Sequence, residues 1–140
     1  MSGLSTTWAN EILDHVTGNA DAPTLVGLPY IGLSTTKPAS DGTNVTEPSG
    51  GNYARVACNT VAWGAASARS IANEAAVVFA TANGTWAAGV ALEYWVIYTA
   101  ITAGTLIMWG EITGTGPIVT SGMTPSFAIG VLTATIATDQ

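Results

Sequence analysis

An apolar segment from Trp86 to Ile112 most strongly constrains what this chain can fold into. The segment is rich in aromatic and β-branched residues, and Thr102-Ala103-Gly104-Thr105 interrupts it once. A segment of this kind either crosses a membrane as a helix or forms long buried strands. Glu93 lies inside its most apolar part, where a carboxylate is costly in lipid, and no lysine or arginine flanks either end. We therefore expect a β-hairpin with a turn near residue 103.

Both arms of this hairpin alternate as strands do. The first arm places Leu92, Tyr94, Val96 and Tyr98 on one face and Glu93, Trp95 and Ile97 on the other. The second arm places Leu106, Met108, Gly110 and Ile112 opposite Ile107, Trp109 and Glu111. Because both faces are largely apolar, we expect central strands that are covered on both sides.

The rest of the chain predicts further strands separated by turns rich in glycine and proline. They are expected at Thr24–Thr36, Tyr53–Trp63, Ala75–Phe79 and Ser126–Ala137, with a long loop over Lys37–Gly51. Pro29 would make the first an edge strand or mark a bulge in it, and Gly130 would place a bulge in the last. We expect a single domain over residues 1–140, mainly β, folded as an antiparallel β-sandwich or barrel.

A short N-terminal α-helix is expected over about residues 4–17. Ser5 or Thr6 can cap its first turn. Trp8, Ile12 and Val16 recur every four residues and form one apolar stripe. So short a helix is not stable alone, so its Trp8 face should dock on the sheet or on a neighbouring subunit.

Charged residues are scarce, at 9% of the chain, whereas 48% of the residues are hydrophobic. Such a chain either hides surface against copies of itself or a partner, or is kept soluble by its threonine, serine, asparagine and glycine residues, and we expect both. Its formal net charge is −6, and its only cations are Lys37, Arg55 and Arg69. This balance argues against partnership with nucleic acid or with an anionic membrane surface.

Residues that could carry catalysis or bind metals are few. His15 is the only histidine and Cys58 the only cysteine, so we expect no enzyme activity, no cofactor and no metal site. A small glycosidase is one alternative, and it predicts Glu93 and Glu111 in one cleft, roughly 5 to 10 Å apart. The N-terminus has neither the basic nor the apolar region of a secretory signal, so we expect synthesis in the cytoplasm.

The aromatic residues raise a second alternative, a glycan-binding surface. Tryptophan rings can form a platform on which sugars stack, although most of the five tryptophans are expected to pack in the core. Trp86 and Trp109 are the candidates for this platform. Trp86, next to an Asn83-Gly84 turn signal, is expected to be the most exposed.

Motifs spread over the whole chain resemble those of a protein family. They are Leu4–His15, Gly32–Pro38, Val45–Arg55, Asn73–Trp86 and Ser121–Phe127, and the most specific is Gly50-Gly51-Asn52-Tyr53-Ala54-Arg55. With these motifs the chain resembles the small structural proteins of tailed bacteriophages that are often called tail-fiber-like. The resemblance implies a virion protein without catalytic activity, made in the host cytoplasm without a signal peptide.

Within that class we expect an oligomeric capsid decoration or head-fiber protein on the particle surface, because the chain lacks the repeats of a long fiber shaft. A homotrimer is the guess, with the major capsid protein or other virion proteins as partners. The alternative is a tail-fiber or tail-tip component that binds a host surface glycan. The candidate contacts with subunits or the virion are Trp8, Ile12, Tyr53 and Arg55. Arg55 would either clamp the Glu47 loop or bridge to a neighbour's carboxylate.

Overall fold

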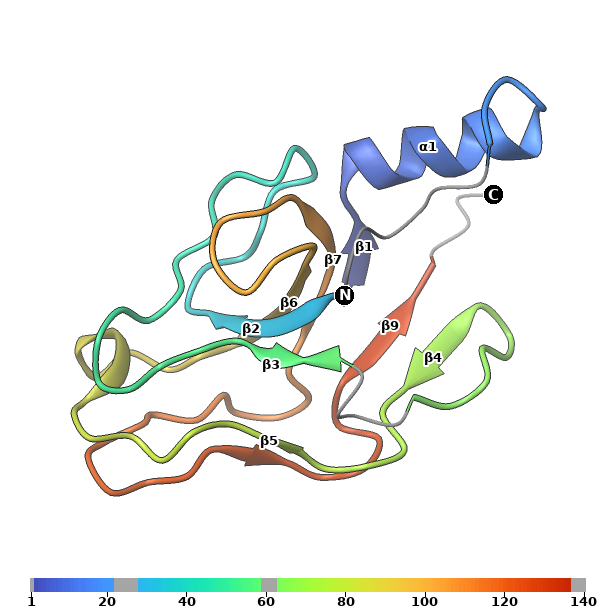
Figure 1. The fold of residues 1–140 in the computed structure, drawn as a ribbon. Coiled ribbons are helices and arrows are strands. Elements are labelled where there is room, and N and C mark those ends of the chain that lie inside the picture. The colour runs from blue at the N-terminus through green and yellow to red at the C-terminus, as the bar shows by residue number, and fades with distance from the viewer. Residues whose placement is uncertain (1, 22–27, 59–62, 137–140) are drawn as a thin grey trace.

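The computed structural model describes residues 2–21, 28–58 and 63–136. A five-stranded antiparallel sheet, in the order β1-β7-β6-β2-β3, dominates it, and two ribbons, β4-β9 and β5-β8, accompany the sheet (Figure 1). The elements are β1 Ser2–Leu4, α1 Thr6–Val16, β2 Tyr30–Ser34, β3 Val56–Ala57, β4 Ser70–Ala72, β5 Val77–Val78, a 3-10 turn at Trp86–Gly89, β6 Tyr94–Tyr98, β7 Leu106–Glu111, β8 Ser126–Phe127 and β9 Thr133–Thr135. The predicted class, mainly β and antiparallel with a short N-terminal helix, is confirmed.

The central hairpin is confirmed as β6 and β7, although its first arm is shorter than predicted because residues 90–93 are not strand and Trp86–Gly89 is a 3-10 turn. The two strands pair Val96 with Trp109 and Ile97 with Met108, and the register then shifts between Ile97 and Tyr98. Tyr98 pairs with Leu106, so Ile107 is the extra residue of a bulge. Leu106 therefore shares a face with Trp109, not with Met108 as predicted.

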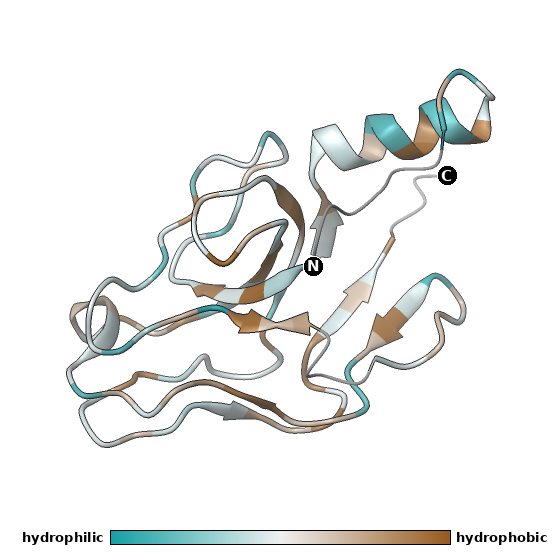
Figure 2. Ribbon diagram, viewed as in Figure 1, coloured by the Kyte–Doolittle hydropathy of each residue, from teal (hydrophilic) through white to brown (hydrophobic). Residues whose placement is uncertain are grey.

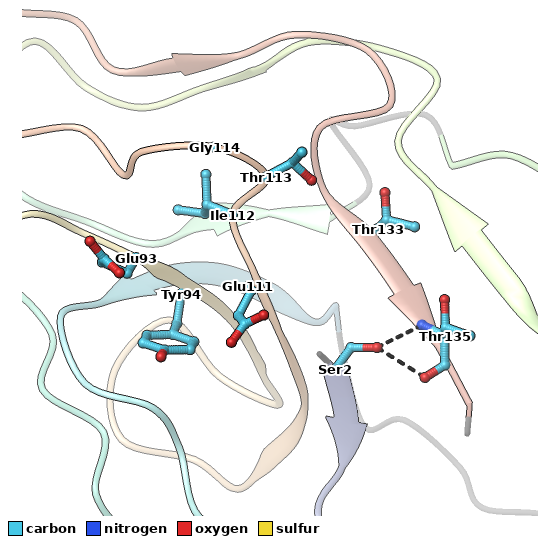
Figure 3. Close-up of a pocket in the computed structure, with 9 residues that line it drawn as sticks. All are labelled: Ser2, Glu93, Tyr94, Glu111, Ile112, Thr113, Gly114, Thr133 and Thr135. Carbon is cyan, nitrogen blue, oxygen red and sulfur yellow. Dashed lines mark hydrogen bonds between the residues drawn. The ribbon is translucent and has the colours of Figure 1, made fainter. Parts of the chain in front are cut away.

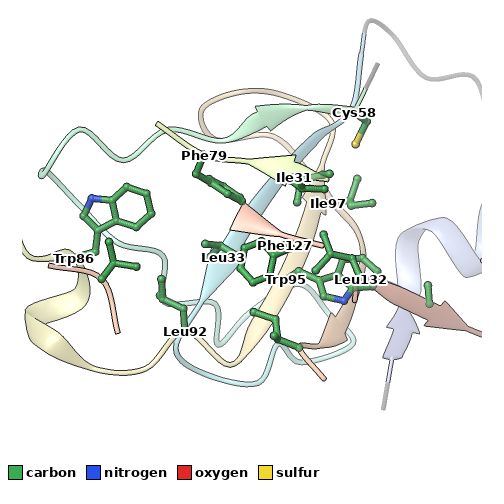
Figure 4. Packing of buried hydrophobic residues seen from close by; sticks show 14 of the residues in the cluster. Ile31, Leu33, Cys58, Phe79, Trp86, Leu92, Trp95, Ile97, Phe127 and Leu132 are labelled. Carbon is green, nitrogen blue, oxygen red and sulfur yellow. The ribbon is translucent and has the colours of Figure 1, made fainter. Parts of the chain in front are cut away.

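The main core lies between one face of the sheet and the β5–β8 ribbon (Figure 4). Trp95 is fully buried there, and its indole lies across Gly110 of the neighbouring strand. A Cβ on Gly110 would come within 2.5 Å of this ring, so the close packing requires glycine at that position. Phe79 and Phe127 of the ribbon side are buried in the same cluster and contact each other edge to face.

The other face of the sheet carries a second, smaller cluster of buried side chains: Val96, Tyr98, Leu106 and Trp109. Val45, from the loop between β2 and β3, packs against this cluster. The sheet is therefore apolar and covered on both sides, as the alternation in the sequence predicts.

Some predicted strands differ in position or length. The prediction that Pro29 makes an edge strand is wrong, because β2 lies between β6 and β3 and Pro29 precedes it, where its carbonyl accepts a hydrogen bond from the Cys58 N–H. The predicted Ser126–Ala137 strand divides into β8 and β9, and Gly130 lies in the turn between them with φ of 77°. Residues 24–27, 59–62 and 137, on which parts of three predicted strands fall, lie outside the described residues.

The helix α1 is anchored at its first turn only. Ser5 caps it, accepting from the Trp8 N–H at 3.4 Å, and the backbone N–H groups of Ser5 and Thr6 donate to the carbonyls of Ile107 and Ser40. Trp8 packs against the main core, but no residue of the helix is buried, and the helix projects from the body of the protein (Figure 1). With 11 residues α1 cannot cross a bilayer, and the described part of the chain contains no other helix that could.

A buried asparagine joins two parts of the fold that are distant in sequence. Asn73, 1% exposed, donates from Nδ2 to the carbonyls of Ala75 at 2.7 Å and Ala128 at 3.0 Å, and its Oδ1 accepts from the Leu132 N–H at 3.0 Å. The side chain thus holds the start of the β5 segment against the turn between β8 and β9. Buried groups of this kind are costly to leave without partners.

Asn73→Ala should lower the free energy of unfolding by about 2–4 kcal/mol, because it removes three hydrogen bonds and deprives the Leu132 N–H and the Ala75 carbonyl of the Asn73 side chain, while the Ala128 carbonyl keeps its bond from the Val131 N–H. Urea unfolding followed by circular dichroism measures the loss. Asn83→Ala is the matched control, since Asn83 is exposed, and it should change the free energy by no more than about 0.5 kcal/mol. Equal stability of the two variants would contradict the assignment.

Candidate assembly site

Two of the candidate contact residues, Tyr53 and Arg55, converge on Glu47. Arg55 donates from Nε to Glu47 Oε1 at 3.0 Å and from Nη2 to Glu47 Oε2. Tyr53 donates its hydroxyl proton to Glu47 Oε1 at 2.6 Å and accepts from the Leu33 N–H at 2.9 Å. We call these three side chains the Glu47 clamp. Gly32 of β2 makes room for it, because a Cβ there would collide with the Glu47 carboxylate and the Tyr53 hydroxyl.

The same arginine also holds the turn of the central hairpin. Its Nη1 donates to the carbonyls of Ala100 and Ala103, each at 2.7 Å, and its guanidinium lies 3.7 Å from the centre of the Tyr98 ring. The Arg55 side chain is 8% exposed and the Glu47 side chain 19%. Of the two roles expected for Arg55, the structure therefore shows the clamp on the Glu47 loop. Tyr53 and Arg55 point inward and tie the loop to the hairpin.

The other two candidates, Trp8 and Ile12, lie on α1. Trp8 is half-buried against the core, whereas Ile12 is 37% exposed. Leu13 and Val16 are 61% and 75% exposed, and Val16 adjoins both Ile12, four residues before it, and Leu13, three residues before it. We call Ile12, Leu13 and Val16 the α1 patch. Leu13 was not singled out from the sequence because it lies off the strict four-residue repeat.

The expectation that Trp86 is the most exposed tryptophan is wrong. Trp86 is 0% exposed, its indole N–H donates to the Gly51 carbonyl at 2.7 Å, and its ring contacts Tyr53 edge to face. Trp109 is 6% exposed, with Lys37 above its ring and Tyr94 at its edge. A sugar stacks only on an open ring face, and neither ring offers one.

Glu93 and Glu111 both line one pocket of about 610 Å³, beside Tyr94 and the threonines of β9 (Figure 3). Their position in one pocket is what the glycosidase alternative requires. Both carboxylates, however, are exposed, whereas the general acid of such an enzyme is desolvated to raise its pKa. Within the described residues no group of three or more histidine, cysteine or acidic side chains is arranged to hold a metal ion.

Arg55→Met should lower the free energy of unfolding by about 2–4 kcal/mol, because Glu47 would keep a half-buried charge without its partner and two carbonyls would lose their donor. Thermal and urea unfolding measure this effect. Glu11→Met removes an exposed charge on α1 and serves as the control, with an expected change within about 0.5 kcal/mol. If the Glu47 clamp contributes little to stability, the two variants will have equal free energies of unfolding.

Burial, followed by the negative charge of Glu47, raises the pKa of Tyr53 well above its ordinary value of 10.0. Above about pH 10 the unfolded chain loses this proton while the folded protein keeps it, so the free energy of unfolding should fall with rising pH. Tyr53→Phe should make this fall shallower, because phenylalanine ionises in neither state. Urea unfolding between about pH 8 and pH 11 tests this, and below about pH 9, where Tyr53 keeps its proton in both states, the two proteins should show the same slope. If the free energy of unfolding of Tyr53→Phe falls with pH as steeply as that of the wild type, the Tyr53 hydroxyl is not buried beside Glu47 as described.

The chain was also compared with known proteins. No curated protein matches it. The model of the Gp80 family, described as podophage GP4 fiber I protein gp80, matches residues 3–135. This match covers nearly the whole chain, including α1, the Glu47 clamp and all of the strands from β2 to β9. The protein therefore belongs to the Gp80 family of podophage fiber I proteins.

Proposed function

We propose that this protein is an oligomeric fiber subunit on the surface of a podophage virion, with a structural and not a catalytic role. The family match over residues 3–135 carries the proposal, since the family is described as a fiber protein. The scarcity of charge and the exposed α1 patch support it, because both suit a chain that buries more surface in an assembly than it does alone. Three copies per assembly remain our working number.

The α1 patch is the proposed contact with another virion protein. Ile12, Leu13 and Val16 are exposed on a helix that is fixed at its base by the Ser5 cap and Trp8 and projects outward (Figure 1). A partner could therefore cover them without rearranging the fold. Burying an apolar side chain of this size contributes about 1.5–3 kcal/mol. We propose attachment to the head, through the major capsid protein, because the chain lacks shaft repeats.

The test is co-sedimentation of the purified protein with empty capsids and, separately, with detached tails. The wild-type protein should be an oligomer that binds capsids, and Leu13→Lys with Val16→Lys should weaken binding at least tenfold without changing the oligomer. Ile101→Lys, at an exposed apolar residue of the hairpin turn, is the control and should bind as the wild type does. Binding to tails alone would move the protein to the tail, and a monomer that binds neither particle would overturn the proposal.

A receptor role is the second candidate, and the pocket at Tyr94 is the observation that favours it. Its two carboxylates and its threonines can exchange hydrogen bonds with sugar hydroxyls, and Tyr94 offers a ring beside them (Figure 3). This candidate requires the protein to bind host surface glycans and to lose that binding in Tyr94→Ala. Hydrolysis of those glycans by the wild type but not by Glu93→Gln would instead revive the glycosidase.

A further inference from the structure

Charge is distributed unevenly over this chain. Residues 75–92 and 112–136 contain no charged side chain, although together they make up almost a third of the sequence. Glu74, Glu93 and Glu111 stand directly at the ends of these two segments. The acidic and basic residues of the described chain therefore lie on the helix, on the loops and at the margins of the uncharged segments.

The two segments are hydrogen-bonded to each other and form one layer of the protein. β5 pairs with β8, and beyond this ribbon the Ala82 N–H donates to the Met123 carbonyl at 2.8 Å. The Trp86 N–H likewise donates to the Val119 carbonyl at 3.0 Å. In Figure 1 the β5–β8 ribbon lies along the bottom of the molecule, opposite α1, and Figure 2 shows this layer mostly in white and brown.

The layer has an inner side and an outer side. Val77 and Phe127 face the core at 0% and 5% exposure, and their strand neighbours Val78 and Ser126, which pair across the ribbon, are exposed. Val78 is 50% exposed, and in the second segment Ile118 is 51% exposed beside the buried Val119. We call the outer side of this layer the uncharged face. Val90 and Met123, also exposed, belong to the same layer.

The paired strands of this layer are also short. β5 and β8 contain two residues each, and a two-stranded ribbon is marginally stable in water without further packing. Yet it covers the main core, including Phe79 and Phe127. A second surface packed on its outer side would bury the exposed apolar side chains of this layer and so stabilise it.

We infer that the uncharged face is the contact between copies of this chain. The inference rests on the proposed function, which requires several copies in one fiber. Each copy carries a formal charge of −6, so surfaces that bear carboxylates repel one another when copies approach. A basic partner would be attracted to those acidic surfaces, and not to a face without charge. Around the axis of a three-copy assembly, the uncharged face of each copy can pack against those of its two neighbours, because such faces meet without burying an unpaired charge.

The test introduces one lysine at a time on this face, as Val78→Lys and as Ile118→Lys, and measures oligomer mass by sedimentation velocity over a range of concentrations. Each variant should shift the oligomer–monomer midpoint at least tenfold toward monomer. The change lowers the net negative charge of every copy, so added repulsion between whole copies cannot explain dissociation. Ile101→Lys is the matched control, since Ile101 in the hairpin turn is also 51% exposed, and it should leave the oligomer intact.

A cross-link gives a second measurement that does not depend on weakening the assembly. Ser126→Cys places a thiol on the uncharged face, and a short bis-maleimide should then join two copies. The native Cys58 is buried, and burial raises the pKa of its thiol to about 12, so it should not react at neutral pH. Thr17→Cys, at the end of α1, is the control and should not cross-link.

The outcomes separate this inference from the proposed function. A wild-type oligomer that persists in Val78→Lys and Ile118→Lys, with no cross-link at Ser126→Cys, would overturn the inferred face while the fiber proposal stands. A wild-type protein that is monomeric but binds particles would also overturn it, and would assign the uncharged face to a virion partner. A wild-type monomer that binds no particle would defeat the proposed function itself.

Discussion

One arginine fixes the position of the loop that covers the second apolar cluster, Val96, Tyr98, Leu106 and Trp109, on its face of the sheet. Arg55 satisfies Glu47 and the carbonyls of Ala100 and Ala103 together, and so holds a long loop and the hairpin turn in one position. The loop in turn covers the second apolar cluster through Val45. Burying an ion pair gains little by itself, but an arginine that also donates to backbone carbonyls of another segment fixes where the two segments lie.

Contacts in the same region explain the residues of the most specific sequence motif, Gly50 to Arg55. Its last residue forms the clamp, Tyr53 adds a hydrogen bond to Glu47, and Gly51 lies against the Trp86 indole. A Cβ on Gly51 would come within 2.7 Å of that ring, and the backbone there has φ of 57°. The motif therefore joins the loop to the core tryptophan on one side and to the hairpin on the other. The motif and Trp86 are parts of one packing arrangement.

The sequence predicted those features that depend on local pattern, such as the β6 alternation, the Ser5 cap and the polar Lys37–Gly51 loop. It could not predict the bulge at Ile107, because an inserted residue leaves the alternation on either side unchanged. Nor could it place Trp86 inside, since the Asn83-Gly84 turn indicates only a reversal and not where the next residue packs. Two further acceptors of Arg55, beside Glu47, are the backbone carbonyls of Ala100 and Ala103, which no side-chain pattern reveals. In this region only Gly32, a glycine in the middle of a strand, indicated that another group closely approaches the backbone.

A chain with so little charge has to control where it associates. Short β5 and β8 strands offer little free edge for pairing, and the acids at positions 74, 93 and 111 stand at the margins of the uncharged segments. Association through the uncharged face is then directed by side chains on its surface, not by open strand edges. The helix α1, which carries the α1 patch, lies at the opposite end of the molecule from the β5–β8 ribbon in Figure 1. Two separate apolar surfaces would allow one chain to contact its copies and a different virion protein at the same time, as the proposed fiber role requires.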